Sequence, residues 1–533
     1  MRRLDAPSRA AVRAVIDAHL AELKVLPGFV GAEPGFPVVD GRILREPAIL
    51  VFVSHKRPPT EVLAEDRVPR QLGAYRVAVL QADPWRQLEA KMAAEGSAFD
   101  LTADAGSLSY EGIEGDPIDT EHEIEGSLLC HLGPDAGWPV LKPFLEATQS
   151  SLTVAMYDFN AAYIAKTFID TVRGGGIEAA LTWDDSMTAP ETEIRGQLRQ
   201  RLKNRLDGAI IQCGSGRRFA SAYHEKVAVR DHASFWLSSG NWSRRSQPDI
   251  DPIGDPATAK GMYSAGNREW HLIVDDESLA QLYERYIRHD LEAAKADLEA
   301  GEPGVALGAE EAWRFPDLLV PIESLTAEPG LALATVEPMA PQALPSVPRR
   351  VKVQPLLTPD NYVGRVSSWL ASARHSIYLQ FAYITYTDKP ADERFTELLL
   401  SLAELSYKPG LDMRIIVGNN GAADKVRRLA EAGFNEAVFR VQGNVHNKGI
   451  VVDGKSVLVS SANWSGDGVL RNRDAGLIVH DPEVAGYFSR AFLDDWETRA
   501  RPTLADNAPV LIAPDDGSTP SGMVRMAWRD YFT

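Results

Sequence analysis

The residues in this chain that are best suited to chemistry occur twice, as two sets of the same residue types at the same intervals. The first set is His224, Lys226, Asp231, Ser239 and Asn241. The second set is His446, Lys448, Asp453, Ser461 and Asn463. A single His-x-Lys pair is usually a surface pattern. Two pairs that share their distances to Asp, Ser and Asn instead predict a duplicated chemical site.

An imidazole, an ammonium group and a carboxamide that converge form half of a phosphate-binding site. Lysine supplies a compact positive charge and asparagine a neutral donor, and both suit non-bridging phosphate oxygens. Histidine, with an ordinary pKa of about 6.5, can act as a nucleophile or as a proton donor near neutral pH. Two facing halves would supply one histidine for each role. The paired lysines and asparagines would hold the transition-state charge without a metal ion or a cofactor.

A nucleophilic histidine also needs an acceptor at its other ring nitrogen, which holds it in one tautomer. The triplets Asn-Arg-Glu and Asn-Arg-Asp follow the two sets at similar places and end at Glu269 and Asp474. We predict that each of these carboxylates orients the histidine of its own half. The alternative is that they form ordinary salt bridges with the adjacent Arg268 and Arg473.

The elements that carry these residues are predicted from side-chain alternation and turn composition. Residues two apart on a β-strand share a face, so each histidine and its lysine are expected to project together from one strand. Residues 453–455, Asp-Gly-Lys, have the composition of a hairpin turn that leads into a returning strand at 456–460. Asp231 is followed by His232 instead of glycine, so the first turn is expected to differ. Both motif aspartates lie an odd number of residues from their lysines and are predicted to be structural.

The surroundings of the two sets are repeated as well, in a pattern of strands that alternate with helices. The matched segments are 145–154 with 370–379, 177–183 with 413–417, and the Pro-Asp pairs 134–135 with 359–360. Such alternation favours a mixed α/β layered fold with parallel strand pairing. Each asparagine of the motif is expected just past a strand, where loops carry function.

About three domains are expected, because 533 residues are long for one core. The predicted division is an accessory module at 1–125, a first lobe at 126–300, a Pro/Ala/Glu-rich linker or wrapping loop at 301–350, a second lobe at 351–500 and a C-terminal tail at 501–533.

The first 125 residues are predicted to form a small α/β module without the spacing of a catalytic site. Apolar periodicity indicates a helix over 8–26 and buried strands at 48–53 and 75–80. Proline and glycine between them predict a turn at 27–31.

At the two sets, the sequence resembles the phospholipase D superfamily, whose hallmark is a doubled His-x-Lys-x4-Asp followed by Gly-Ser-x-x-Asn or a near variant. The resemblance covers roughly residues 128–500 and is closest over 446–479. It implies two α/β lobes related by pseudo-twofold symmetry, with one active site at their interface. It also implies metal-independent hydrolysis of a phosphodiester through a phosphohistidine, with His224 as nucleophile and His446 as general acid and base.

The substrate class is open between nucleic acid and phospholipid. Basic residues gather around the first set, at Arg217, Arg218, Arg244 and Arg245, and in a stretch over 195–205 that is alternatively a solvated helix face. In an acidic chain, such a local cluster favours a polyanionic substrate. A phospholipase D acting on phosphatidyl lipids would be expected to show an amphipathic docking segment, and no clear one is found. We therefore favour a nuclease.

Two further alternatives concern the same motifs. Trp242 and Trp464, which follow the asparagines, are predicted to pack in the core rather than to stack on bases. A non-catalytic binding scaffold is a remote third function, which the intact His, Lys and Asn in both halves disfavour.

The overall composition limits the partners and the compartment. A net charge of −18 argues against binding to nucleic acid or to an anionic membrane through bulk charge. Cys130 and Cys213 alone make no disulfide framework and no zinc-type cluster, which fits a reducing compartment. No signal-peptide core and no apolar run of ~20 residues is found. We expect a cytoplasmic protein, with signal-independent export as the alternative, and neither a transmembrane segment nor an obligate protein partner.

Overall fold

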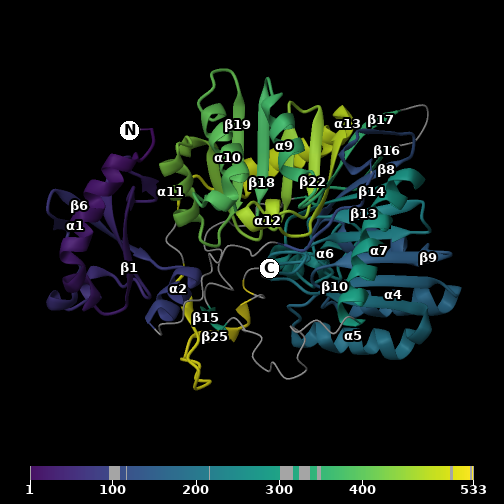
Figure 1. The fold of residues 1–533 in the computed structure, drawn as a ribbon, viewed down its shortest axis with the longest axis horizontal. Helices are drawn as coiled ribbons and strands as arrows, with labels where there is room; N and C mark the ends of the chain where they lie inside the picture. Colours follow the sequence, from purple (N-terminus) through teal and green to yellow (C-terminus); the bar gives the residue numbers. More distant parts are fainter. Residues whose placement is uncertain are drawn as a thin grey trace.

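The structure is a computed structural model that describes residues 2–94, 108–115, 117–214, 216–299, 316–322, 337–344, 350–504, 508–528 and 531. Two eight-stranded mixed sheets lie at the centre of these ranges, with helices packed on them, and a smaller N-terminal module flanks them (Figure 1). The chain therefore has the predicted α/β fold. No helix in the described ranges is both long and apolar enough to cross a membrane.

The first large sheet has the strand order β11-β10-β9-β12-β13-β14-β8-β16. Strands β9, β10 and β11 are parallel and are joined by helices α4 and α5, while the other neighbours pair antiparallel. The helix-then-strand prediction at 145–154 and the strand predicted at 177–183 are confirmed. The bounds are β8 (Leu128–Gly133), α3 (Gly137–Glu146), β9 (Ser151–Met156), α4 (Ala162–Gly175), β10 (Glu178–Asp184), α5 (Ala189–Leu202), β11 (Leu206–Ile211), β12 (Lys226–Arg230), β13 (Ser234–Ser238), α6 (Pro256–Ala265), β14 (Glu269–Asp275), α7 (Glu277–Glu299) and β16 (Gln342–Leu344).

The second large sheet repeats this order strand for strand, as β20-β19-β18-β21-β22-β23-β17-β7. Again the first three strands are parallel and the others antiparallel. The pseudo-twofold relation between the lobes stays a prediction. The bounds are β7 (His122–Ile124), β17 (Val351–Leu357), α9 (Tyr362–Ala371), β18 (Ser376–Phe381), α10 (Glu393–Leu405), β19 (Asp412–Gly418), α11 (Ala422–Ala432), β20 (Phe439–Gln442), β21 (Lys448–Val452), β22 (Ser456–Ser460), α12 (Gly466–Leu470), β23 (Ala475–His480) and α13 (Pro482–Thr498).

The two lobes share one hydrophobic core. Tyr283 and Tyr286 of α7, spaced to face one side of the helix, join a buried cluster with Phe488 and Phe492 of α13 and with strand residues of both sheets. The Tyr283 hydroxyl also donates to the Gly476 carbonyl of the second sheet (2.6 Å). Each buried aromatic side chain removes about 150–250 Å² from water, which stabilises the fold by a few kcal/mol at about 25 cal/mol per Å². This shared core fixes the lobes against each other.

Each large sheet ends in a short strand that comes from the segment preceding the other lobe. Strand β7 precedes the first lobe and pairs with β17 of the second sheet. Strand β16 precedes the second lobe and pairs with β8 of the first sheet. The exchange covers two sheet edges that would otherwise present unpaired backbone groups. Strand β16 falls within 301–350, where a linker is expected, and most of that range lies outside the described residues.

The N-terminal module is a four-stranded sheet of order β1-β4-β6-β5 with α1 packed on it. The helix predicted over 8–26 and the strands predicted at 48–53 and 75–80 are confirmed. The turn predicted at 27–31 is shorter, because strand β1 already begins at Phe29. The bounds are α1 (Ala6–Lys24), β1 (Phe29–Gly35), β2 (Val38–Val39), β3 (Arg42–Ile43), β4 (Ala48–Val53), β5 (Gln71–Leu72), β6 (Tyr75–Gln81) and α2 (Pro84–Ala94).

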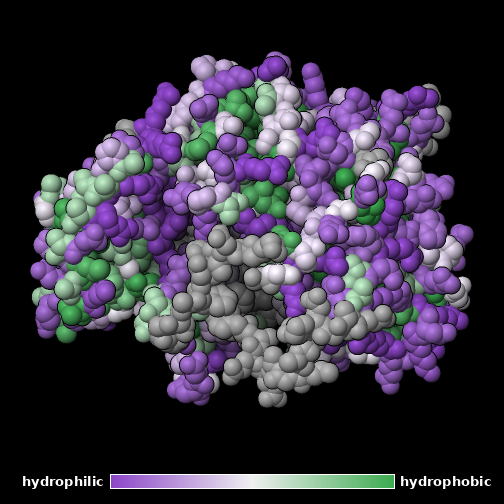
Figure 2. Space-filling model, viewed as in Figure 1, coloured by the Kyte–Doolittle hydropathy of each residue, from purple (hydrophilic) through white to green (hydrophobic). Residues whose placement is uncertain are grey.

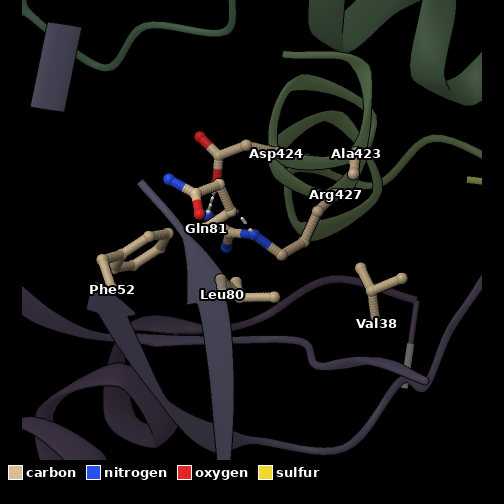
Figure 3. Close-up of a pocket in the computed structure, with 7 residues that line it drawn as sticks. All are labelled: Val38, Phe52, Leu80, Gln81, Ala423, Asp424 and Arg427. Carbon is tan, nitrogen blue, oxygen red and sulfur yellow. Dashed lines mark hydrogen bonds and ion pairs between the residues drawn. The ribbon is translucent and has the colours of Figure 1, made fainter. Parts of the chain in front are cut away.

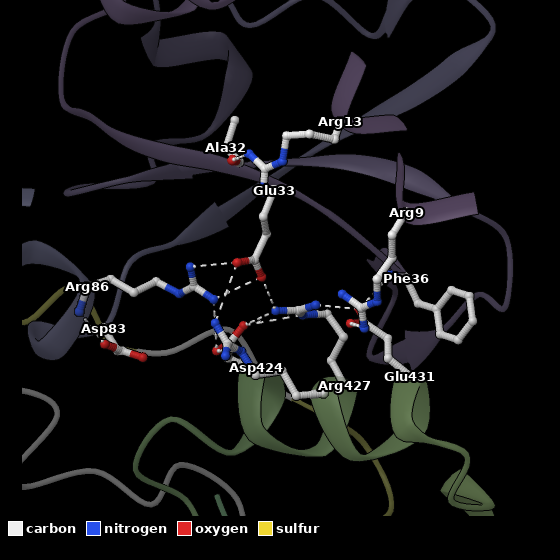
Figure 4. Close-up of polar contacts among 11 residues, drawn as sticks. Arg9, Arg13, Ala32, Glu33, Phe36, Asp83, Arg86, Asp424, Arg427 and Glu431 are labelled. Carbon is white, nitrogen blue, oxygen red and sulfur yellow. Dashed lines mark hydrogen bonds and ion pairs between the residues drawn. The ribbon is translucent and has the colours of Figure 1, made fainter. Parts of the chain in front are cut away.

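The module docks on α11 of the second lobe through a network of ion pairs (Figure 4). Glu33 of β1 pairs with Arg86 at 2.9 Å and with Arg427 of α11 at 2.8 Å, and Asp424 of α11 pairs with the same two arginines. Removing one partner would leave a largely buried charge uncompensated, so the network ties the module to the lobe. The small pocket beside it is lined by Val38, Phe52, Leu80, Gln81, Ala423, Asp424 and Arg427 (Figure 3).

A three-stranded sheet links the segment between the lobes to the end of the chain. Strand β15 (Leu318–Pro321) lies between β24 (Leu511–Ile512) and β25 (Met523–Met526), and the sheet packs on α2. Part of the range expected to be a tail therefore forms a small sheet. The face seen in Figure 2 is mostly hydrophilic, and hydrophobic residues gather on it over the N-terminal module.

The hairpins after the two His-x-Lys pairs turn in the same way, so the prediction of different turns is wrong. The φ angles are 54° at Asp231 and 58° at His232, against 55° at Asp453 and 61° at Gly454. Two successive left-handed residues give the turn that best matches the twist of antiparallel strands. His232 occupies a position that favours glycine, and its ring is held by Glu284 of α7 (Nδ1 to Oε2, 2.5 Å).

The motif aspartates hold the connections between a helix and a strand. Asp453 accepts the backbone N–H groups of Arg374, His375 and Ser376. Asp231 accepts those of Gln149, Ser150 and Ser151. Partial burial raises the pKa of each carboxyl, and the backbone donors outweigh it and hold the pKa below its ordinary value. Both lie at the far end of their hairpin strand from the lysine.

Replacement of Asp453 by alanine is expected to lower the free energy of unfolding by about 1–3 kcal/mol, because three backbone donors lose a charged acceptor. The folded pKa lies below the unfolded one, so this contribution is complete above about pH 4 and is lost as the pH falls through the folded pKa. Urea unfolding at about pH 7 and about pH 3 measures it. The wild type and Asp453→Ala should converge in acid, and the exposed Asp388→Ala is the control. A constant difference at both pH values would contradict this account.

Candidate active site

Each histidine lies just before a strand, in a stretch of backbone that bridges to the other lobe. Strands β12 and β21 begin at the lysines, so the prediction that the histidines belong to these strands is wrong. The His224 N–H donates to the Arg473 carbonyl (2.7 Å), and the His446 N–H donates to the Arg268 carbonyl (3.2 Å). Both histidines therefore lie where the two lobes meet.

The carboxylates orient the histidines across the interface, not within one half. Nδ1 of His224 lies 2.7 Å from Oδ1 of Asp474, and Nδ1 of His446 lies 2.7 Å from Oε1 of Glu269. Glu269 and Asp474 each contact a motif histidine, as predicted. The prediction that each carboxylate orients the histidine of its own half is wrong. Each half of the site is incomplete without the other lobe.

The motif serines fix these carboxylates. The Ser239 hydroxyl donates to Oε2 of Glu269 (2.6 Å), and the Ser461 hydroxyl donates to Oδ1 of Asp474 (2.7 Å). A serine therefore holds the carboxylate of its own half, and that carboxylate holds the histidine of the other half. With Nδ1 of each ring occupied, Nε2 is the nitrogen placed for chemistry.

The adjacent arginines have other partners. Both guanidinium groups are fully buried and saturated by two carboxylates each at 2.8–3.0 Å. The partners are Asp135 and Asp495 for Arg268, and Asp290 and Asp360 for Arg473. The alternative prediction, that these arginines form salt bridges with Glu269 and Asp474, is therefore wrong. The repeated Pro-Asp pairs of the sequence supply Asp135 and Asp360.

The two lysines are fully buried, and each contacts the histidine of its own motif. Nζ of Lys448 is 2.9 Å from Nε2 of His446 and 3.4 Å from the carbonyl oxygen of Ser239 in the other lobe. Nζ of Lys226 donates to the carbonyl of His224 (2.8 Å). Burial lowers the pKa of Lys448 to about 8, and burial together with the nearby Lys448 charge holds the pKa of Lys226 well below its usual value. An anion placed beside them would offset both effects.

The motif asparagines follow β13 and β22, as predicted. Asn241 is fully buried, and neither polar atom of its amide has a hydrogen-bond partner among the described residues. Oδ1 of Asn463 has none within the same ranges. A buried amide without partners is costly, so the site is built for a polar ligand that would satisfy Asn241.

The pKa values of the two carboxylates are shifted in opposite directions. Burial alone would raise the pKa of Glu269, but the imidazole of His446 and the ammonium of Lys448 outweigh it and hold that pKa below its ordinary value. Burial raises the pKa of Asp474 to about 7 and lowers that of His446 to about 4. The halves of the site are therefore electrostatically unequal.

Tyr157 is a site residue that the motifs did not indicate. Its ring packs edge-on against His224 with centroids 4.5 Å apart, and Nζ of Lys226 lies 5.1 Å from its centroid. Trp242 and Trp464 are fully buried against other aromatic rings, which confirms that they pack in the core.

The candidate substrate-binding arginines have different surroundings. Arg218 pairs with Asp297 of α7 at 3.3 Å, which gives it a structural contact. Arg217 is partly buried, whereas Arg244 and Arg245 are exposed on the segment directly after the motif asparagine. The basic stretch 195–205 lies mostly on α5.

Cys130 and Cys213 are free cysteines that form no disulfide with each other. In the described part of the chain, Asp184, Asp185 and Cys213 are close enough to hold a metal ion, but Asp184 already accepts the N–H of Tyr223 (2.8 Å). The prediction that catalysis needs no metal ion stays a prediction.

The chain is similar to several known proteins. Residues 366–496 match the family model described as cardiolipin synthase, PLD-like domain. A phospholipase D of Rickettsia bellii is 26% identical over 154 residues, 28% of this chain and 70% of that protein. The human mitochondrial cardiolipin hydrolase is 26% identical over 191 residues, 35% of this chain and 67% of that protein. The phosphatidylserine synthase of Haemophilus influenzae aligns over 73% of this chain and 88% of its own, with 11% identity and a TM-score of 0.44.

The family match and these relatives support assignment of the chain to the phospholipase D superfamily and to its phosphodiester hydrolases.

The crossed pairing predicts which histidine each carboxylate controls. Glu269→Gln should abolish the far-downfield Nδ1–H proton resonance of His446 and leave that of His224, and Asp474→Asn should do the reverse. Both substitutions should lower kcat by about a hundredfold or more, because a catalytic imidazole loses its orientation. Proton NMR of the two variants, with signals assigned from His224→Asn and His446→Asn, checks this. Loss of the His224 signal in Glu269→Gln would contradict the crossed arrangement.

Proposed function

We propose that the protein hydrolyses phosphodiesters through a covalent phosphohistidine without a metal ion, and that its substrate is nucleic acid. The observation that carries this proposal is the pair of buried histidines, each held at Nδ1 by a carboxylate of the other lobe at 2.7 Å. Two imidazoles with fixed tautomers supply a nucleophile and a proton donor in one site.

In the first step, Nε2 of His224 attacks phosphorus and the bond from phosphorus to the leaving oxygen breaks. Protonated His446 gives its Nε2 proton to that oxygen. The phosphohistidine carries positive charge on the ring, which Asp474 stabilises at 2.7 Å from Nδ1. Burial keeps the pKa of His446 near 4 in the free protein, and an anionic phosphodiester beside the ring favours its protonated form, so the acid is generated when substrate binds.

In the second step, neutral His446 removes a proton from water as the water oxygen attacks phosphorus. The bond between phosphorus and Nε2 of His224 breaks, and both histidines return to their starting states. The products are a phosphomonoester and an alcohol. Lys226, Lys448 and the amide of Asn241 provide the positive charge and the donor for the phosphoryl oxygens, a role that a metal ion fills in other phosphodiesterases.

The choice of nucleic acid is supported by the exposed Arg244 and Arg245, which follow Asn241 directly. A polymer chain that continues beyond the scissile phosphate would reach these guanidinium groups. Phospholipid is the second candidate, because the same connection between β13 and β14 exposes Ile253 (44%) and Met262 (51%). Exposed apolar side chains beside a site are suited to contact with a bilayer, and the relatives include a phospholipase D and a cardiolipin hydrolase.

Binding of an oxyanion is expected to be coupled to proton uptake. The free protein holds the pKa of both lysines and of His446 below their ordinary values, and the bound anion raises them. Tungstate, which keeps one charge state near neutral pH, should therefore bind more weakly as the pH rises from about 6 to about 9. Titration calorimetry in buffers of different ionisation enthalpy measures the protons taken up. Binding without proton uptake would contradict the lowered pKa values of the two lysines and of His446.

Hydrolysis in EDTA tests the mechanism and the substrate together. We expect single-stranded or double-stranded nucleic acid to be cleaved with EDTA present, and His224→Ala and His446→Ala to lose that activity by at least about a thousandfold. Acid-labile phosphate should remain on the denatured wild type and be absent from His224→Ala. Cleavage confined to phosphatidylcholine vesicles would replace nucleic acid by phospholipid, and activity that survives both substitutions would overturn the mechanism.

A further inference from the structure

The two halves of the site differ at one position close to the shared motif. Ser246 and Gly468 stand at the same place in the two repeats, and their N–H groups donate to the hydroxyls of Ser243 (3.3 Å) and Ser465 (3.2 Å). The local backbone is therefore alike. A β-carbon at Gly468 would lie 2.2 Å from the carbonyl oxygen of Asn463, so the second half has no room for a side chain there.

The Ser246 side chain reaches the orienting carboxylate of its own half. Its hydroxyl donates to Oε1 of Glu269 (2.8 Å), the same oxygen that faces Nδ1 of His446. The amide of Asn267 donates to the Ser246 oxygen (3.4 Å), which leaves the hydroxyl proton for Glu269. Ser246 is fully buried.

This contact makes the two carboxylates unequal in hydrogen bonding. Glu269 receives hydroxyl donors at both oxygens, from Ser239 and Ser246. Asp474 receives one, from Ser461, and its Oδ2 has no hydrogen-bond partner among the described residues.

We infer that Ser246 is a positioning residue that makes the His446–Glu269 pair the proton-donating half of the site. The inference rests on the proposed phosphohistidine mechanism. A second hydroxyl donor lowers the basicity of Glu269, so the imidazolium of His446 gives up its proton more readily. Asp474 stays the stronger base, and its pull on the Nδ1 proton of His224 makes Nε2 the better nucleophile.

The charged groups that face His446 are Glu269, Lys448 and Lys226. Burial is the largest cause of its low pKa, the two lysines act in the same direction, and Glu269 opposes them. Loss of the Ser246 hydroxyl would strengthen the opposing effect of Glu269. His446 would then be a weaker acid, with its pKa closer to the ordinary value.

The test compares two phosphodiesters that differ in the leaving group. A dinucleotide, or phosphatidylcholine if lipid is the substrate, needs a proton on its alkoxide leaving group, whereas bis(p-nitrophenyl) phosphate releases a stable phenolate without one. Ser246→Ala should lower kcat for the alkyl diester about tenfold and change kcat for the aryl diester less than about twofold. The alkaline limb of the alkyl-diester profile of kcat should move to higher pH.

Two further variants complete the experiment. Ser246→Thr keeps the hydroxyl and should restore the rate with the alkyl diester. Ser264→Ala, on exposed α6, removes a hydroxyl that donates to the Gly261 carbonyl (2.9 Å) and should match the wild type on both substrates. If Ser246→Ala fails to fold by circular dichroism, Ser246→Gly, which copies the second repeat, takes its place.

The outcomes separate the inference from the mechanism. An equal loss with both diesters, or no loss with either, overturns the role of Ser246 and leaves the phosphohistidine mechanism standing. Wild-type protein that cleaves neither diester, or aryl-diester activity that survives His224→Ala, overturns the mechanism and the inference with it.

Discussion

The contact between each histidine and a carboxylate of the opposite lobe sets the conditions for the rest of the structure. Nδ1 and the carboxylate oxygen are 2.7 Å apart in both pairs, and such contacts weaken steeply with small displacements. The lobes must therefore be joined rigidly. The shared core of α7 and α13, the backbone bridges at the histidines and the exchanged strands provide that rigidity, where independent domains would move against each other.

Rigidity is combined with an unusual amount of buried charge. The histidines, lysines and carboxylates of the site are nearly all inaccessible to solvent, and the two arginines that precede the carboxylates in the sequence are buried as well. Burying charged groups is unfavourable, and apolar residues of similar size would often give a more stable protein at such a place. Burial lowers the pKa of both lysines, and the Asn241 amide has no hydrogen-bond partner among the described residues. Both features favour an anion at the site.

Much of the fold and the site was predictable from the sequence, for identifiable reasons. Apolar patterns located α1, β4 and β6 of the N-terminal module and β9, β10, β18 and β19 of the two large sheets. The doubled motif located the histidines, lysines and asparagines. The crossed pairing was not predictable, because Glu269 and Asp474 stand at equal places after their own sets and sequence intervals do not distinguish the near lobe from the far one. The turn at His232 depends on Glu284, a residue remote in sequence. Ser246 was not predicted, because the sequence comparison looked for residues that the two repeats share. At the position of Ser246 the second repeat has Gly468.

The exchanged strands make each lobe depend on a segment that lies outside its own part of the chain. Strand β7 precedes one lobe and completes the sheet of the other, and β16 does the same in return, so neither lobe is a self-contained part of the gene product. A lobe on its own would have an open sheet edge and a histidine without its carboxylate. Within the one chain, the segment of the other lobe supplies the missing strand and the other lobe supplies the missing carboxylate. Because both halves of the site belong to one chain, their sequences can differ. Ser246 in the first repeat and Gly468 in the second are such a difference.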